Sequence, residues 1–156
     1  MTIVRCRHAA DVEVKMEIVQ LIMDCIGVVI LGFLTLTDIK TKKISVILPL
    51  IFGVCSIFIP WDAQGISNAL LGGIPGMMLL ALHRPSKGQI GVGDGLMLLG
   101  MGLHLGLSKA FMAWFYSLGI LFIFSCIGLI MKKLKPKSQV PFAPFYLAAY
   151  IGVVVL

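Results

Sequence analysis

Six long apolar stretches, separated by short polar segments, constrain this sequence more than any other feature. They cover residues 18–37, 44–60, 66–83, 94–107, 110–131 and 141–156. Hydrophobic residue types make up 59% of the chain and charged types 13%, whereas an average soluble domain has about 25% charged residues. A backbone exposed to lipid must satisfy its own hydrogen bonds, and helices do this. The sequence therefore predicts an all-α, polytopic membrane protein with about six transmembrane helices.

The distribution of basic residues predicts how this protein is oriented. The segments after the first, third and fifth stretches hold three, two and four Lys or Arg residues, whereas the other side holds Lys109 and the charge-balanced N-terminal tail. Short loops rich in Lys and Arg stay in the cytoplasm. We therefore predict that these three loops face the cytoplasm of a multi-pass protein of the cell membrane. The net charge of +6 then reflects orientation in a lipid bilayer, and we expect no nucleic-acid partner.

Two regions are predicted along the chain. Residues 1–17 carry balanced charges and lack an apolar core, so we expect a short exposed N-terminal tail rather than a signal peptide. Residues 18–156 form the six-helix membrane domain. Within it, glycines spaced four apart predict close approach of helix backbones. These pairs are Gly72 and Gly76, Gly91 and Gly95, and Gly102 and Gly106.

Three aspartates lie in or at the edge of the apolar stretches. A carboxylate there is costly unless it is hydrated or paired, so each is a candidate functional residue. Asp38 ends the first stretch and Asp94 begins the fourth, which places both at the cytoplasmic edge in the predicted topology. Two carboxylates held together cannot both ionise cheaply, so they share a proton, as aspartic-protease chemistry requires. Asp38 and Asp94 are therefore the predicted catalytic pair, with single interfacial acids as the alternative.

Asp24 lies 14 residues before Asp38, about 21 Å away along a helix. That distance excludes it from the pair. We expect it to pair with Lys109 or His104, or to occupy a partly hydrated site. Neither the histidines nor the cysteines show metal-ligand spacing, so no metal or cofactor is expected.

Glycines surround the second candidate aspartate. Asp94 follows Gly91 and Gly93 and precedes Gly95. Glycine adopts backbone torsions closed to other residues and leaves room for a second chain to approach. Gly91 and Gly93 are therefore candidate substrate-binding residues.

The sequence resembles the type IV prepilin peptidases, a family of GxGD intramembrane aspartic proteases. The segment 38–44, Asp-Ile-Lys-Thr-Lys-Lys-Ile, is similar to the first aspartate motif of that family. The segment 91–94, Gly-Val-Gly-Asp, and the Leu/Gly-rich run 98–106 resemble its GxGD motif and the run that follows it. The segment 141–145, Pro-Phe-Ala-Pro-Phe, is similar to the motif that opens the last helix of the family.

This resemblance implies an aspartic endopeptidase that removes the basic leader of prepilins or pseudopilins at the cytoplasmic membrane face. Asp38 and Asp94 would be its catalytic residues. Pro141, Phe142 and Pro144 lie at the same membrane level and would line the substrate cleft, or would serve only to start a helix.

The chain departs from the family pattern at three positions and in one loop. Ser45 and Val46 replace the usual Pro and Asn, and Leu96 replaces a Lys found in many members. Longer members carry a cysteine-rich cytoplasmic loop, linked to N-methylation, between their first two helices. Here residues 39–43 alone separate the first two stretches, which resembles the short, peptidase-only form.

Three other functions remain open on the sequence. One is a protease of the signal-peptide-peptidase or presenilin type, whose other motifs are not found. Another is a small proton- or cation-coupled transporter that uses the intramembrane aspartates. Such transporters usually place acids at the midplane and show internal repeats. The last is a membrane scaffold, which would leave the two edge carboxylates unexplained.

Overall fold

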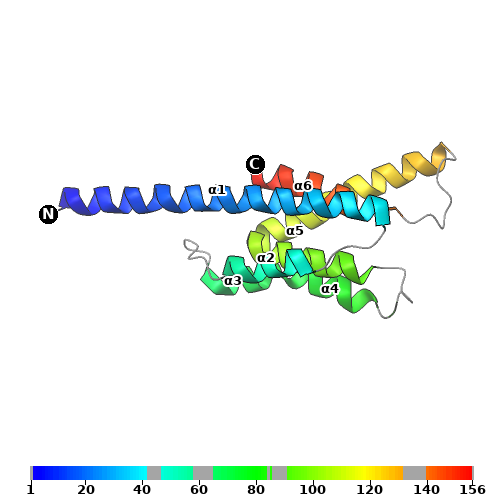
Figure 1. Ribbon diagram of the computed structural model, residues 1–156, viewed down its shortest axis with the longest axis horizontal. Coiled ribbons are helices and arrows are strands. Elements are labelled where there is room, and N and C mark those ends of the chain that lie inside the picture. The colour runs from blue at the N-terminus through cyan, green and yellow to red at the C-terminus, as the bar shows by residue number, and fades with distance from the viewer. Residues whose placement is uncertain are drawn as a thin grey trace.

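A computed structural model of the chain describes residues 2–41, 47–57, 65–83, 85, 91–131 and 140–155. Within these residues the fold is entirely helical (Figure 1). The helices are α1 (Thr2–Thr41), α2 (Ile47–Ile57), α3 (Gly65–Gly72), α4 (Ile74–His83), α5 (Val92–Ile130) and α6 (Ala143–Val155). The predicted all-α class is therefore confirmed.

The six transmembrane helices expected from the sequence are not confirmed by the described residues. In the described part of the chain, three helical segments are long and apolar enough to cross a membrane, namely Glu17–Ile39, Gly65–His83 and Val92–Ile130. Two shorter apolar helices, Ile47–Ser56 and Ala143–Val155, accompany them. These lengths support an integral membrane protein but do not confirm six spans.

The fourth and fifth apolar stretches are the two helical halves of α5, which are joined at a sharp reversal of the chain. Gly106 has φ 75° and ψ 173°, outside the helical region, and residues with a Cβ rarely adopt such a positive φ. The chain folds back there, so both ends of α5 lie at the same end of the molecule (Figure 1). The backbone N–H of Leu107 donates to Asn68 Oδ1 of α3 at 3.0 Å. Asn68 thus replaces a hydrogen bond that the bend removes.

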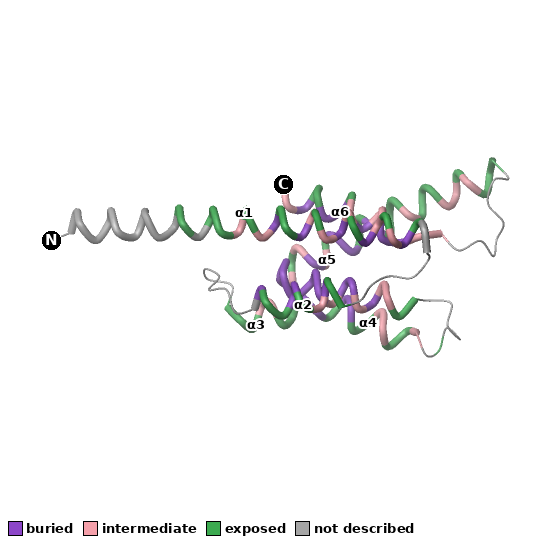
Figure 2. The backbone as a smooth tube through the Cα atoms, viewed as in Figure 1, coloured by how far each residue is buried: buried purple, intermediate pink, exposed green. Residues whose placement is uncertain are grey.

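The first apolar stretch belongs to a longer helix than expected. Residues 2–17, predicted as a tail, are helical and continuous with it. The described side chains at the start of α1 are exposed, and burial begins further along the helix (Figure 2).

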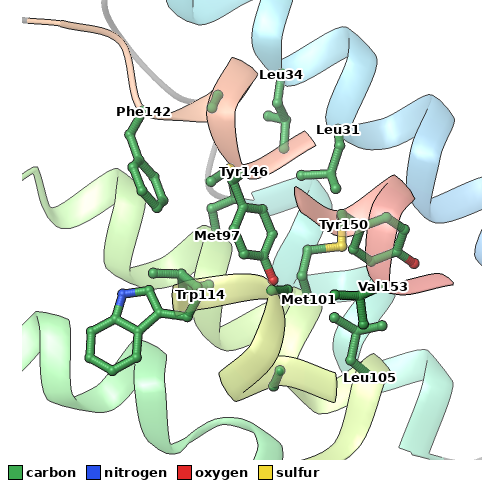
Figure 3. Packing of buried hydrophobic residues seen from close by; sticks show 14 of the residues in the cluster. Leu31, Leu34, Met97, Met101, Leu105, Trp114, Phe142, Tyr146, Tyr150 and Val153 are labelled. Carbon is green, nitrogen blue, oxygen red and sulfur yellow. The ribbon is translucent and has the colours of Figure 1, made fainter. Parts of the chain in front are cut away.

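The helices form two groups that share α5. One group contains α1, α6 and the second half of α5, and the other contains α2, α3, α4 and the first half of α5 (Figure 1). α6 packs against both α1 and α5, whereas the backbone of α1 does not pack extensively on α5. The main core lies where the groups meet. There Tyr146 and Tyr150 of α6 point toward Met97 and Met101 of α5 (Figure 3).

Glycines set the contacts of the first half of α5 with α2, α3 and α4, as the spacing of the small residues predicts. A Cβ on Gly102 would collide with the carbonyl group of Gly72, and one on Gly76 would collide with the backbone of Leu99. A Cβ on Gly100 would collide with the carbonyl group of Pro49 in α2. Backbone therefore meets backbone along the first half of α5, and this contact admits no side chain.

This packing predicts the effects of two matched substitutions in α5. Gly100→Ala forces the backbones of α2 and α5 apart, and we expect it to destabilise the fold by about 1–3 kcal/mol. Gly119 has no atom within 4 Å of the place its Cβ would occupy, so Gly119→Ala is expected to be neutral or to stabilise by about 0.5–1 kcal/mol. Thermal unfolding in detergent measures both, and equal midpoints for the two variants would contradict the packing.

Candidate active site

The two candidate catalytic aspartates lie at helix ends on the same side of the molecule. Asp38 is in the last turn of α1, and its residue is 6% exposed. Asp94 is in the first turn of α5 and is half-buried. The C-terminal end of α1 and the N-terminal end of α5 both lie at the right of Figure 1.

Asp38 also contacts the start of α6. Its Oδ2 accepts a long hydrogen bond, 3.4 Å, from the backbone N–H of Ala143. The first N–H groups of a helix lack partners inside the helix, and the positive end of the helix dipole favours a negative charge there. Asp38 thus caps α6, and Asp94 lies in the corresponding first turn of α5. Two helix N-termini therefore converge on the carboxylate pair.

The glycines before Asp94 give its carboxylate room. Gly91 is the N-cap of α5 and has extended torsions, φ −67° and ψ 129°. A Cβ there would lie 2.9 Å from Asp94 Oδ2, closer than such atoms normally approach. Gly91 is exposed and Gly93 is half-buried in the first turn. The polypeptide beside Asp94 is therefore bare backbone, which is what an approaching substrate strand needs.

The segment 141–145 lies next to the aspartates, at the start of α6. Phe142 is buried, while Pro141 and Pro144 are half-buried. Pro144 falls in the first turn of α6, where no intrahelical partner awaits a proline N–H. The segment thus starts the helix and also supplies the Ala143 N–H to Asp38. That the segment also lines a substrate cleft stays a prediction.

Asp24 lies apart from Asp38 and Asp94 and is hydrogen-bonded to His104. Its Oδ1 is 2.9 Å from His104 Nε2, and the residues are 8% and 4% exposed. Of the two partners expected for Asp24, the structure therefore selects His104 and not Lys109. Within the described residues, no group of three or more His, Cys, Asp or Glu side chains is placed to hold a metal.

Several sequence predictions fall outside the described part of the chain. Eight of the nine basic loop residues on which the orientation depends lie there, as do Ser45 and Val46, whereas Lys40 is in α1. Leu96, the third departure from the family pattern, is half-buried in α5.

Two features of the site were not predicted. One is the hydrogen bond from the Ala143 N–H, which a sequence cannot display because every residue except proline has the same group. The other is the support of the α5 bend by Asn68. Asn68 is the only asparagine in the sequence and lies in an apolar stretch. A polar side chain in such a stretch needs a hydrogen-bond partner, so the sequence could have indicated a structural role for it.

This arrangement suits acid–base chemistry on a carbonyl group. Two carboxylates that interact through their charges favour a state in which they hold one proton between them. One can then take a proton from water while the other donates to a carbonyl oxygen. The nearby bare backbone leaves space for an extended substrate.

A sequence model of the type IV leader peptidase family matches residues 25–133. This match covers more than half of the chain, so the protein belongs to the type IV leader peptidase family, and the resemblance seen in the motifs is confirmed. The matched region contains both Asp38 and Asp94 and ends before the Pro-Phe-Ala-Pro-Phe segment. No curated protein and no solved structure matches the chain.

The contact between Asp38 and Ala143 gives a test that changes one hydrogen-bond donor. Ala143 is the first residue of α6, where proline is tolerated, so Ala143→Pro removes the N–H while keeping the helix. Hydrogen bonds to charged groups contribute about 1.5–3 kcal/mol, and we expect peptidase activity to fall roughly tenfold or more. Ala143→Gly keeps the N–H and serves as the matched variant. Equal activities of the two proteins, measured at equal abundance, would show that this donor is dispensable.

Proposed function

We propose that this protein is an intramembrane aspartic endopeptidase with Asp38 and Asp94 as its catalytic residues. It removes the basic leader peptide of type IV prepilins or pseudopilins at the cytoplasmic membrane face. The observation that carries the proposal is that these two carboxylates lie at the end of α1 and the start of α5, on the same side of the molecule (Figure 1). Membership of the leader peptidase family supports the reaction class and does not favour the transporter alternative.

In the proposed mechanism, the two carboxylates share one proton. The ionised one removes a proton from water, and the oxygen of that water attacks the scissile carbonyl carbon. The protonated one donates to the carbonyl oxygen as the tetrahedral intermediate forms. When the intermediate collapses, the C–N bond breaks, the leaving amine takes the proton from the protonated carboxyl group, and one hydroxyl group of the intermediate returns its proton to the other carboxylate, so the pair again holds one proton. Gly91 and Gly93, with Pro141, Phe142 and Pro144, border the space for the substrate segment.

The proposed orientation is supported by where the charged loops attach. The basic segments follow α1, α4 and α5, and the C-terminal ends of these helices lie together at the right of Figure 1. Asp38 and Asp94 lie at that same end. Under the positive-inside rule, the pair then faces the cytoplasm, where a prepilin leader meets its hydrophobic helix.

The direct test is leader cleavage of a prepilin in membranes that contain single variants. Asp38→Asn and Asp94→Asn each remove one ionisable group, and we expect either to reduce cleavage by about 10²–10⁴-fold, as loss of a general acid or base does. Cleavage is followed as the shift in prepilin size, normalised to peptidase abundance.

Glu17→Gln is the matched control, because Glu17 is an exposed acid on the same helix as Asp38 and lies far from the site. We expect it to cleave normally. Full cleavage by either Asn variant, at normal abundance, would contradict the proposed pair.

A further inference from the structure

We infer that Asp24 and His104 are positioning residues for the peptidase reaction: the buried hydrogen bond between them fixes the placement of α1 against α5, and thereby the separation of Asp38 and Asp94. The effect of this pair on catalysis rests on the proposed function. Its effect on the placement of α1 against α5 does not.

The pair links the two helices that carry the carboxylates. Asp24 is on α1 and His104 is on the first half of α5, with 2.9 Å between their Oδ1 and Nε2 atoms. The backbone of α1 packs mainly on α6, and over a smaller area on α2, but not extensively on α5. α1 is thus connected to α5 mainly through α6, whereas the contact between Asp24 and His104 connects the two helices directly.

The pair lies in the core at a meeting point of four helices. The Phe52 ring of α2 lies 4.8 Å from the His104 ring between centroids, and the Tyr150 ring of α6 lies 6.5 Å away. The neighbouring packing is tight as well, because a Cβ on Gly27 would collide with the Tyr150 hydroxyl group. Removing one partner would leave the other charged or polar group buried beside these rings.

Apolar contacts and the Asp24–His104 hydrogen bond restrict α1 in different ways. The contact between α1 and α6 involves Leu31, Leu34 and Tyr146 (Figure 3), and hydrophobic contacts are non-directional. A hydrogen bond holds two particular atoms within about 3 Å, and buried polar pairs can fix register in this way. Asp24 therefore stops α1 from sliding or rotating along the apolar surface of α6.

Such a shift would be transmitted to the site along rigid helices. Asp24 is 14 residues from Asp38, and His104 is 10 residues from Asp94, about 21 Å and 15 Å along their helices. Neither residue of the pair reaches the reacting atoms, so its effect on catalysis is through placement. A displacement of about 1 Å in a catalytic group can cost about 10²-fold in rate.

The principal variant replaces both partners, Asp24→Leu with His104→Leu. Replacement of both partners of a buried polar pair by apolar residues of similar size is often neutral or stabilising, so the fold should survive while the directional link is lost. We expect kcat to fall by about 10²-fold, with a smaller change in KM. Asp24→Asn retains an oxygen acceptor for His104 and is expected to keep most of the activity.

A distance measurement tests the same inference without using catalysis. Spin labels are placed on Ile39→Cys and Val92→Cys, which are exposed neighbours of the two aspartates, in the full chain with its native cysteines replaced. Labels on Ile47→Cys and Val92→Cys form the control pair, because α2 and α5 pack directly on each other. In the double Leu variant we expect the 39–92 distance distribution to shift and broaden, and the 47–92 distribution to stay as in the parent.

The outcomes separate this inference from the proposed function. An unchanged 39–92 distribution in the double Leu variant would overturn it, and so would equal changes in both label pairs, which would indicate a general loss of packing. Ser117→Ala removes a buried hydrogen bond within α5 alone and should alter neither distribution. If Asp38→Asn or Asp94→Asn cleaved normally, the proposed function would fail, while the label distances would still decide the role of Asp24 and His104.

Discussion

The reversal of the chain at Gly106 is the constraint on which the rest of this structure depends. The positive φ at this glycine lets α5 fold back, so that Asp94 and the far end of α5 lie at the same end of the molecule as Asp38. The reversal is held from both sides. Asn68 accepts the Leu107 N–H, and the carbonyl group of Gly102 presses against Gly72. Because these contacts involve backbone atoms, a larger side chain at Gly72 or Gly102 would fit only if a helix moved.

The site follows from the same requirement for satisfied backbone groups. Inside a bilayer the helix interior has no spare donors, whereas each N-terminus presents unpaired N–H groups. Asp38 accepts one of these from α6, and Asp94 lies in the first turn of α5. Helix ends can thus hold carboxylates at the edge of an apolar protein. The glycines before Asp94 and the first residues of α6 leave room beside the carboxylates for the backbone of a substrate.

The Asp24–His104 pair solves a different problem, which is how to place α1. Most of the surface that α1 shares with its neighbours is apolar and does not specify a register. One directional contact in the core supplies that specification at a distance from the chemistry. The acids of the membrane region are in this way divided between two tasks, with Asp24 setting placement and the pair at the helix ends available for proton transfer.

The sequence by itself determined the helical class, the membrane setting and the candidate acids, because hydropathy and the cost of a carboxylate in lipid act locally. It also indicated the close helix contacts at Gly72 and Gly102, since glycine spacing is visible in the chain. Only the tertiary structure decided that the reversal between the fourth and fifth stretches falls at Gly106, that His104 rather than Lys109 pairs with Asp24, and that Ala143 donates to Asp38. Each of these depends on which helices become neighbours. A torsion angle or a backbone N–H carries no mark in the sequence that distinguishes it from the others.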